Sequence, residues 1–161
     1  MKKRFLIAWL ITGLVGSGLH FLYDLCPAPL ISLIAPVSES VWEHLKLLYW
    51  PFLGASAILA HTTKDRPRAW SAFLASLLLQ PLVLTAVYYL MRNGFGVESV
   101  FADILLYFLV LAGGFYLSFR LYGSGTAERL LGVLIVMAAI YGVSLMVFTL
   151  AAPNLPIFIA P

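Results

Sequence analysis

The stretch of residues 38–51 reads SESVWEHLKLLYWP and concentrates two glutamates, a histidine and a lysine within eight positions. Elsewhere the chain is apolar: 62% of its 161 residues are hydrophobic and only 11% are charged. Soluble domains carry about 25% charged residues, so this composition is typical of a membrane protein. The polar cluster therefore marks the beginning of one membrane span, and the apolar runs around it define the others.

Apolar runs of roughly 20 residues, the length that crosses a bilayer as a helix, recur along the chain. We expect a single integral membrane domain over residues 1–161, an all-α polytopic helix bundle with about five transmembrane helices. Breaks rich in Gly, Pro and charged residues separate the runs. The expected spans are residues 4–25, 41–61, 69–91, 99–120 and 127–151.

The basic residues predict the orientation of this bundle, because cytoplasmic loops carry an excess of Lys and Arg. With the N-terminus in the cytoplasm and the C-terminus outside, eight of the ten basic residues lie inside, and only Lys46 and Arg92 lie outside. The first span follows a basic N-terminus, as a signal peptide would. It is nevertheless long enough to cross a membrane, and no small-residue cleavage site precedes Cys26, so we expect it to be retained.

The charge distribution argues against a nucleic-acid partner, and the cysteine content excludes two kinds of cysteine-based structure. The formal charge of +3 does not indicate nucleic-acid binding, since the basic residues lie in short clusters between apolar runs and form no basic face. A single cysteine excludes a disulfide framework within the chain and a Cys-rich metal site. The lipid bilayer is the partner that composition predicts, while a partner protein or a homo-oligomer stays open.

With this topology most acidic residues, and two of the three histidines, fall at the outer ends of three spans. The polar groups of separate helices are therefore expected to converge at one depth, on the outer side of the membrane. They are His20 and Asp24 in the first span, Glu39, Glu43 and His44 at the second, and Glu98 and Asp103 at the fourth.

His20 and Asp24 lie four residues apart and share one face of the first predicted helix. The small residues Gly13, Gly16 and Ser17 lie on the same face, where they allow another helix to approach closely. We therefore expect His20 to point into the bundle. A His–Asp hydrogen bond that only joins two helices is the alternative interpretation of this pair.

Ser40 and Glu43 have the spacing of a capping box, which predicts the N-terminus of the second span. Glu43 and Lys46 can also pair one turn apart. Capping does not account for His44. Nor does it account for Glu39 and Glu43 four residues apart, because two carboxylates repel unless a cation or a proton lies between them.

Asp103 lies about one turn inside the apolar run of the fourth expected span. An acidic residue inside a span is costly, so we expect it to face the bundle interior and to have a partner, either Lys46 or His20. A structural salt bridge with no further role is the alternative.

The sequences HFLYD (20–24) and SESVWEHLK (38–46) together resemble a family of small, uncharacterised bacterial polytopic membrane proteins. That family carries a His-x-x-Tyr element followed by an Asn/Ser-Glu-Ser-x-Trp-Glu-His-x-Lys element. The resemblance implies a multi-pass protein of the bacterial cytoplasmic membrane and cell envelope, and it implies no activity. The matching positions are His20, Tyr23, Glu39, Ser40, Trp42, Glu43, His44 and Lys46.

These residue types favour a divalent-metal site, with zinc as the first choice, in a membrane-embedded hydrolase or transferase that acts on a lipid or envelope substrate. The expected metal ligands are His20, Asp24, Glu43, His44 and Asp103. The expected catalytic groups are a spare glutamate as general base, Glu39 or Glu43, and Lys46 as the group that stabilises an oxyanion. No established zinc signature is present, since Ser40 stands where an inverted zincin motif has its first histidine.

Three other interpretations of the polar cluster stay open. The same groups can capture a cation or a small polar ligand in a binding or transport accessory protein without catalysis. The pair of His20 and Asp24 can orient a general base without any metal. Finally, the polar side chains can serve only as contacts between helices.

Overall fold

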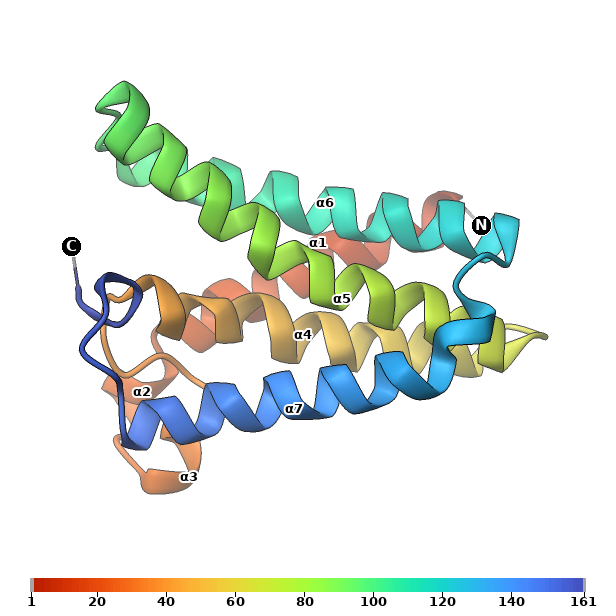
Figure 1. The fold of residues 1–161 in the computed structure, drawn as a ribbon, viewed down its shortest axis with the longest axis horizontal. Helices are drawn as coiled ribbons and strands as arrows, with labels where there is room; N and C mark the ends of the chain where they lie inside the picture. Colours follow the sequence, from red (N-terminus) through yellow and green to blue (C-terminus); the bar gives the residue numbers. More distant parts are fainter. Residues whose placement is uncertain (1, 161) are drawn as a thin grey trace.

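The computed structural model describes residues 2–160, which form helices joined by loops, with no strand in that range (Figure 1). The predicted all-α fold is therefore confirmed. The long helices are α1 (Lys2–His20), α4 (Val41–His61), α5 (Arg66–Tyr89), α6 (Val100–Ser124) and α7 (Leu131–Leu150). The short ones are α2 (Leu22–Leu25), α3 (Pro29–Ser32), η1 (Leu90–Gly94), η2 (Glu128–Leu130) and η3 (Pro156–Phe158).

Three helical segments are long and apolar enough to cross a membrane: Arg66–Gly94, Val100–Ser124 and Glu128–Leu150. A shorter apolar helix covers Arg4–His20. Helix α4 is neither one of the three long apolar segments nor one of the shorter apolar helices. Apolar side chains also face outward over much of the bundle; Leu109 is 60% exposed and Ile140 is 62% exposed. Such a surface suits a lipid environment, as the composition predicted.

The first helix is shorter than the expected span of residues 4–25. It ends at His20, and the one-turn helix α2 follows after Phe21. The Phe21 N–H donates to the carbonyl of Gly18 at 3.3 Å, so the hydrogen-bonding pattern tightens to three residues in the last turn. As a result, His20 lies at the end of α1, next to the loop that leads to α4.

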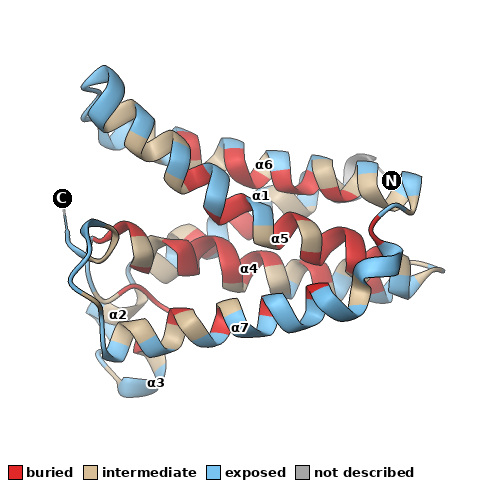
Figure 2. Cartoon of the chain, in the orientation of Figure 1, coloured by how far each residue is buried: buried red, intermediate tan, exposed pale blue. Residues whose placement is uncertain are grey.

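Helix α4 lies at the centre of the bundle and contacts α1, α5 and α7. Eleven of its 21 residues are buried. Figure 2 shows buried residues along α4 and also along the facing sides of α5 and α6. The expected cap is present, because Ser40 Oγ accepts a hydrogen bond from the Glu43 N–H at 3.3 Å. The polar stretch therefore begins a helix that packs against α1, α5 and α7.

Small residues bring α1 close to its neighbours, as predicted. Gly16 is buried, and a Cβ atom at this position would lie only 2.7 Å from the Leu47 carbonyl oxygen and would also collide with Tyr107. Gly13 packs against Phe108 of α6 in the same way. This close packing holds the end of α1, and with it His20, beside the beginning of α4.

Candidate functional site

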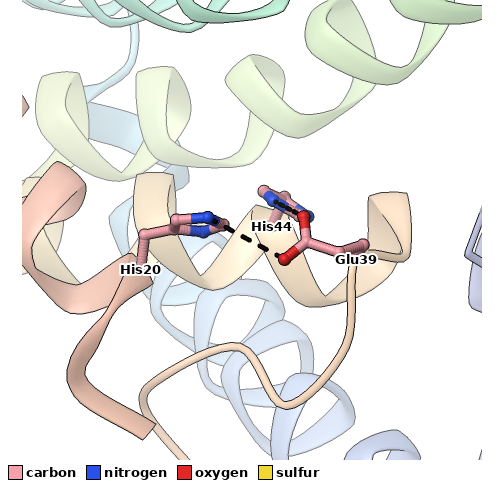
Figure 3. A group of neighbouring side chains, drawn as sticks. All are labelled: His20, Glu39 and His44. Atoms are coloured by element: carbon pink, nitrogen blue, oxygen red, sulfur yellow. Dashed lines mark ion pairs between the residues drawn. The ribbon is translucent and has the colours of Figure 1, made fainter. Parts of the chain in front are cut away.

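Three polar side chains from separate segments meet at one end of the bundle. His20 ends α1, Glu39 belongs to the loop before α4, and His44 lies in the first turn of α4; Figure 3 shows the three turned toward one another. Glu39 Oε2 lies 3.4 Å from His44 Nε2, and Glu39 Oε1 lies 3.9 Å from His20 Nε2. The two imidazole rings have centroids 5.1 Å apart.

The spacing of these groups is close to that of a metal site. One ligand atom from each of the three residues can be chosen so that all lie within 4.8 Å of one another. Zinc bonds to nitrogen and oxygen are about 2.0–2.1 Å long, so tetrahedral ligand atoms lie about 3.4 Å apart. The contact of Glu39 with His44 already has this spacing, whereas His20 Nε2 lies 3.9 Å from Glu39 Oε1, so the His20 ring would have to move closer to complete the set.

The group is open to its surroundings. The side chains of His20 and His44 are 29% and 31% exposed, while that of Glu39 is 71% exposed. Three protein ligands with a further position open are typical of catalytic zinc sites, whereas structural sites are closed by four protein ligands. The exposure therefore leaves room for a water molecule or a substrate atom.

The orientation of the His44 ring is fixed by the cap of α4. His44 Nδ1 lies 2.8 Å from the Ser40 carbonyl oxygen, which can only accept a hydrogen bond, so Nδ1 carries the proton. In neutral His44 the lone pair is then on Nε2 and faces the Glu39 carboxylate. Two such electron-rich groups at 3.4 Å require a proton or a cation between them.

The His20 ring has no comparable restraint among the described residues. Its Nδ1 atom is buried and has no hydrogen-bond partner there, while its ring packs edge-on against Phe21 with centroids 4.9 Å apart. Both tautomers of His20 are therefore compatible with the fold, and either presents Nε2 toward Glu39. A bound cation would select the tautomer with its proton on Nδ1.

Glu43 and Lys46 form a separate, buried ion pair. Their side chains are 5% and 0% exposed, and Lys46 Nζ lies 2.7 Å from Glu43 Oε2. Lys46 Nζ also donates to the carbonyl oxygens of Ser32 at 2.8 Å and Ala35 at 3.3 Å. All three donors of the ammonium group are thereby used.

The Glu43 carboxylate has further partners on two other segments. Its Oε2 atom accepts the N–H of Val37 at 2.9 Å, and its Oε1 atom accepts the hydroxyl of Thr149 at 2.9 Å. The ion pair therefore connects the loop before α4 to α4 itself and to the last turn of α7. Because Val37 lies two residues before Glu39 in the same loop, these hydrogen bonds also fix the position of Glu39.

The structure brings together only part of the predicted site. His20 and His44 meet, with Glu39 as the carboxylate between them, whereas Glu43 is committed to Lys46. Asp24 is exposed on α2 and does not belong to the three-residue group.

Asp103, in the first turn of α6, also lies outside this group. Its expected partnership with Lys46 or His20 is not formed, and no ion pair within 4.0 Å involves Asp103 among the described side chains of residues 4–160. The physical reason is that the Lys46 ammonium faces the loop carbonyls and Glu43, which leaves it no donor for α6.

Two functional features were missed from the sequence. The role of Thr149 as a partner of Glu43 is one; its only signal was a polar residue in the last turn of a mostly apolar helix. The Ser40 carbonyl, which orients His44, is the other, and it has no side-chain signal at all. Glu39 was expected as a general base, and its position between two histidines instead makes it a ligand candidate.

Comparison with known proteins adds a family but no activity. Residues 1–160 match the model of a family that is described as a family of unknown function. No curated protein and no solved structure matches the chain. The match confirms the resemblance to an uncharacterised family and leaves the geometry as the source of functional inference.

The buried ion pair yields a prediction about stability. Glu43→Gln should lower the free energy of unfolding by about 3–5 kcal/mol, because it leaves the Lys46 ammonium buried without a countercharge. Replacing both residues, by Glu43→Gln with Lys46→Met, should recover part of that loss because no unpaired charge is left. Thermal and denaturant unfolding in detergent micelles measure both effects.

The matched control is Glu98→Gln, which removes an exposed carboxylate in the loop before α6 and should change stability by less than about 0.5 kcal/mol. A Glu43→Gln protein as stable as the unmodified chain would show that the pair does not hold this end of the bundle together.

Proposed function

Because the chain belongs to DUF6512, a family of unknown function, we propose its function from geometry: a multi-pass membrane protein that binds a divalent, zinc-like ion between His20, Glu39 and His44. The observation that carries the proposal is the convergence of three ligand atoms, from α1, the following loop and α4, within 4.8 Å. Two imidazoles and one carboxylate are also a ligand set that zinc accepts.

The surroundings of the group support a metal rather than an isolated ion pair. The bond from His44 Nδ1 to the Ser40 carbonyl is the outer contact that metal-binding histidines almost always make, and it leaves Nε2 for the ion. An ion at this place would also separate the Glu39 carboxylate from the His44 lone pair. A single bound cation thus satisfies groups that otherwise face one another without a donor.

The open position favours a hydrolase or a transferase. A zinc ion held by three protein ligands supplies Lewis acidity and lowers the pKa of a bound water to about 7. Glu39 and the two histidines would hold the ion, and the bonds of Glu43 with Val37 and Lys46 would keep Glu39 in place. The exposed site can receive a substrate without a conformational change of the bundle.

The substrate class follows from the position of the site at the ends of the helices, the depth of lipid headgroups. The loop that carries Glu39 also presents apolar side chains outward, with Leu25 81% and Leu30 79% exposed. Such side chains suit the boundary between headgroups and acyl chains. We therefore propose a lipid or a lipid-linked envelope molecule with an ester or phosphoester bond as the substrate.

The arrangement in the membrane is proposed from the charge distribution. Figure 1 shows the N-terminus, the α4–α5 connection (62–65) and the α6–α7 connection (125–130) at one end, opposite the loop of residues 21–40. Eight of the ten Lys and Arg residues belong to that first end. We propose that the five long helices span a bacterial cytoplasmic membrane, and the positive-inside rule then places the site on the outer side.

A second candidate function is cation capture without catalysis, in an accessory protein for binding or transport. The observation that favours it is the commitment of Glu43 to Lys46, because with Glu39 as a ligand neither glutamate is left as a general base. Turnover of a lipid phosphoester by the zinc-loaded protein, absent in His44→Ala, would support the enzyme; metal binding without turnover would support the accessory protein.

The metal proposal predicts one bound zinc ion per chain. His44→Ala should weaken zinc binding more than about tenfold, since loss of an outer partner alone typically costs 10–100-fold in affinity. Calorimetric titration of the purified protein with Zn²⁺, followed by metal analysis after dialysis, measures this effect.

The matched control for this experiment is His61→Ala, which removes a histidine from the opposite end of the same helix and should leave zinc binding unchanged. Equally weak binding by the unmodified protein and by both variants would remove the metal site from consideration.

The orientation predicts which face of the membrane exposes Cys26, the single cysteine, which is exposed in the loop after α2. A membrane-impermeant maleimide should label it in intact spheroplasts. The control is Thr126→Cys in a Cys26→Ser background, at an exposed position of the α6–α7 connection, which should be labelled only after the membrane is opened. The reverse pattern would place the histidine site in the cytoplasm.

A further inference from the structure

A polar hollow lies between the first turn of α5 and the connection from α6 to α7. Figure 1 shows these segments at the end of the bundle opposite the loop of residues 21–40. It has a volume of about 600 Å³. Its lining residues are Arg68, Ser124, Gly125, Glu128 and Arg129. Unlike the other surface hollows near α6, which are lined mainly by apolar side chains, this one is lined mostly by polar and charged groups.

The charges around this hollow are not neutralised within the fold. Among residues 4–160, whose side chains the structure describes, neither Arg68 nor Arg129 forms an ion pair within 4.0 Å, and Glu128 forms none either. Among the five lining residues, two guanidinium groups and one carboxylate leave an excess positive charge. The nearby Asp65 carboxylate accepts the backbone N–H of Arg68 at 3.3 Å. In addition, Arg68 Nε is buried without a hydrogen-bond partner in the described part of the chain.

The fold holds Arg68 in a fixed place. Its Nη2 atom donates to the Gly123 carbonyl at 2.7 Å, and its guanidinium carbon lies 5.6 Å from the centroid of the Tyr122 ring. Gly125, with a φ of +66°, gives the guanidinium space, because a Cβ atom there would lie 3.0 Å from Arg68 Nη2. Nη2 makes this one hydrogen bond and Nε is buried, so the remaining Nη N–H groups are the donors left for a ligand.

We propose that this hollow binds a phosphate group, with Arg68 and Arg129 as the donors. A guanidinium group matches the geometry of a phosphate and forms two parallel hydrogen bonds to its oxygens. The ends of membrane helices lie at the depth of lipid headgroups, so the phosphodiester of an anionic phospholipid is the nearest source. The carboxylate of Glu128, on the exposed rim, is then placed to accept a hydrogen bond from a hydroxyl group of the headgroup beyond the phosphate. This site does not depend on the metal centre.

The test is the retention of lipid by the full chain in native mass spectrometry, with equal amounts of phosphatidylglycerol and phosphatidylcholine present. The unmodified protein should retain phosphatidylglycerol preferentially, and Arg129→Gln should retain about fivefold less, which is the contribution expected of one arginine near an anionic headgroup. Arg129 is exposed, so its replacement leaves the fold intact. Arg68→Gln should have a larger effect, since it also removes the bond to Gly123.

Arg120→Gln is the matched control, because it removes the same charge from an exposed position on α6 that does not line the hollow. It should retain phosphatidylglycerol as the unmodified protein does. Displacement of the lipid by inorganic phosphate would identify a site that also accepts soluble phosphate, and no displacement would assign it to the lipid alone. Equal retention by Arg129→Gln and the unmodified protein, or an equal loss in Arg120→Gln, would overturn the proposal.

Discussion

The buried ion pair of Glu43 and Lys46 is the interaction on which the functional end of this protein depends. Burying two opposite charges costs several kcal/mol per ion unless their geometry is good and their remaining donors and acceptors are satisfied. Here the ions lie 2.7 Å apart, and backbone groups of the preceding loop together with Thr149 take up the other positions. The pair therefore binds the loop to α4 and α7 and fixes the position of the end of the loop, just before α4.

The candidate metal centre is a consequence of that constraint and of two others. Close packing at Gly16 brings the end of α1 to α4, and the Ser40 carbonyl orients the ring of His44. The loop held by the ion pair then places Glu39 between the two histidines. Each ligand is thus positioned by a different part of the fold, so an exposed group of three side chains has a defined geometry.

Much of the fold, but only part of the site, could be predicted from the sequence. Helix positions follow from apolar runs and from the cap at Ser40, because span length and capping are local properties. The choice of Glu39 over Glu43 as the carboxylate near the histidines could not be predicted. Helical periodicity places both on one face, whereas Glu39 precedes the helix and Glu43 turns toward the loop. The partners of Lys46 are backbone carbonyls, which leave no trace in a residue pattern.

X-ray absorption spectroscopy at the zinc edge of the zinc-loaded protein tests the central claim most directly, because it reports the ligands of the ion itself. The account predicts nitrogen and oxygen neighbours at about 2.0–2.2 Å, with the outer-shell scattering of two imidazole rings, and with one ring lost in His20→Ala. A shell of oxygen atoms without imidazole scattering, unchanged by that substitution, would show that zinc binds elsewhere and would contradict the account.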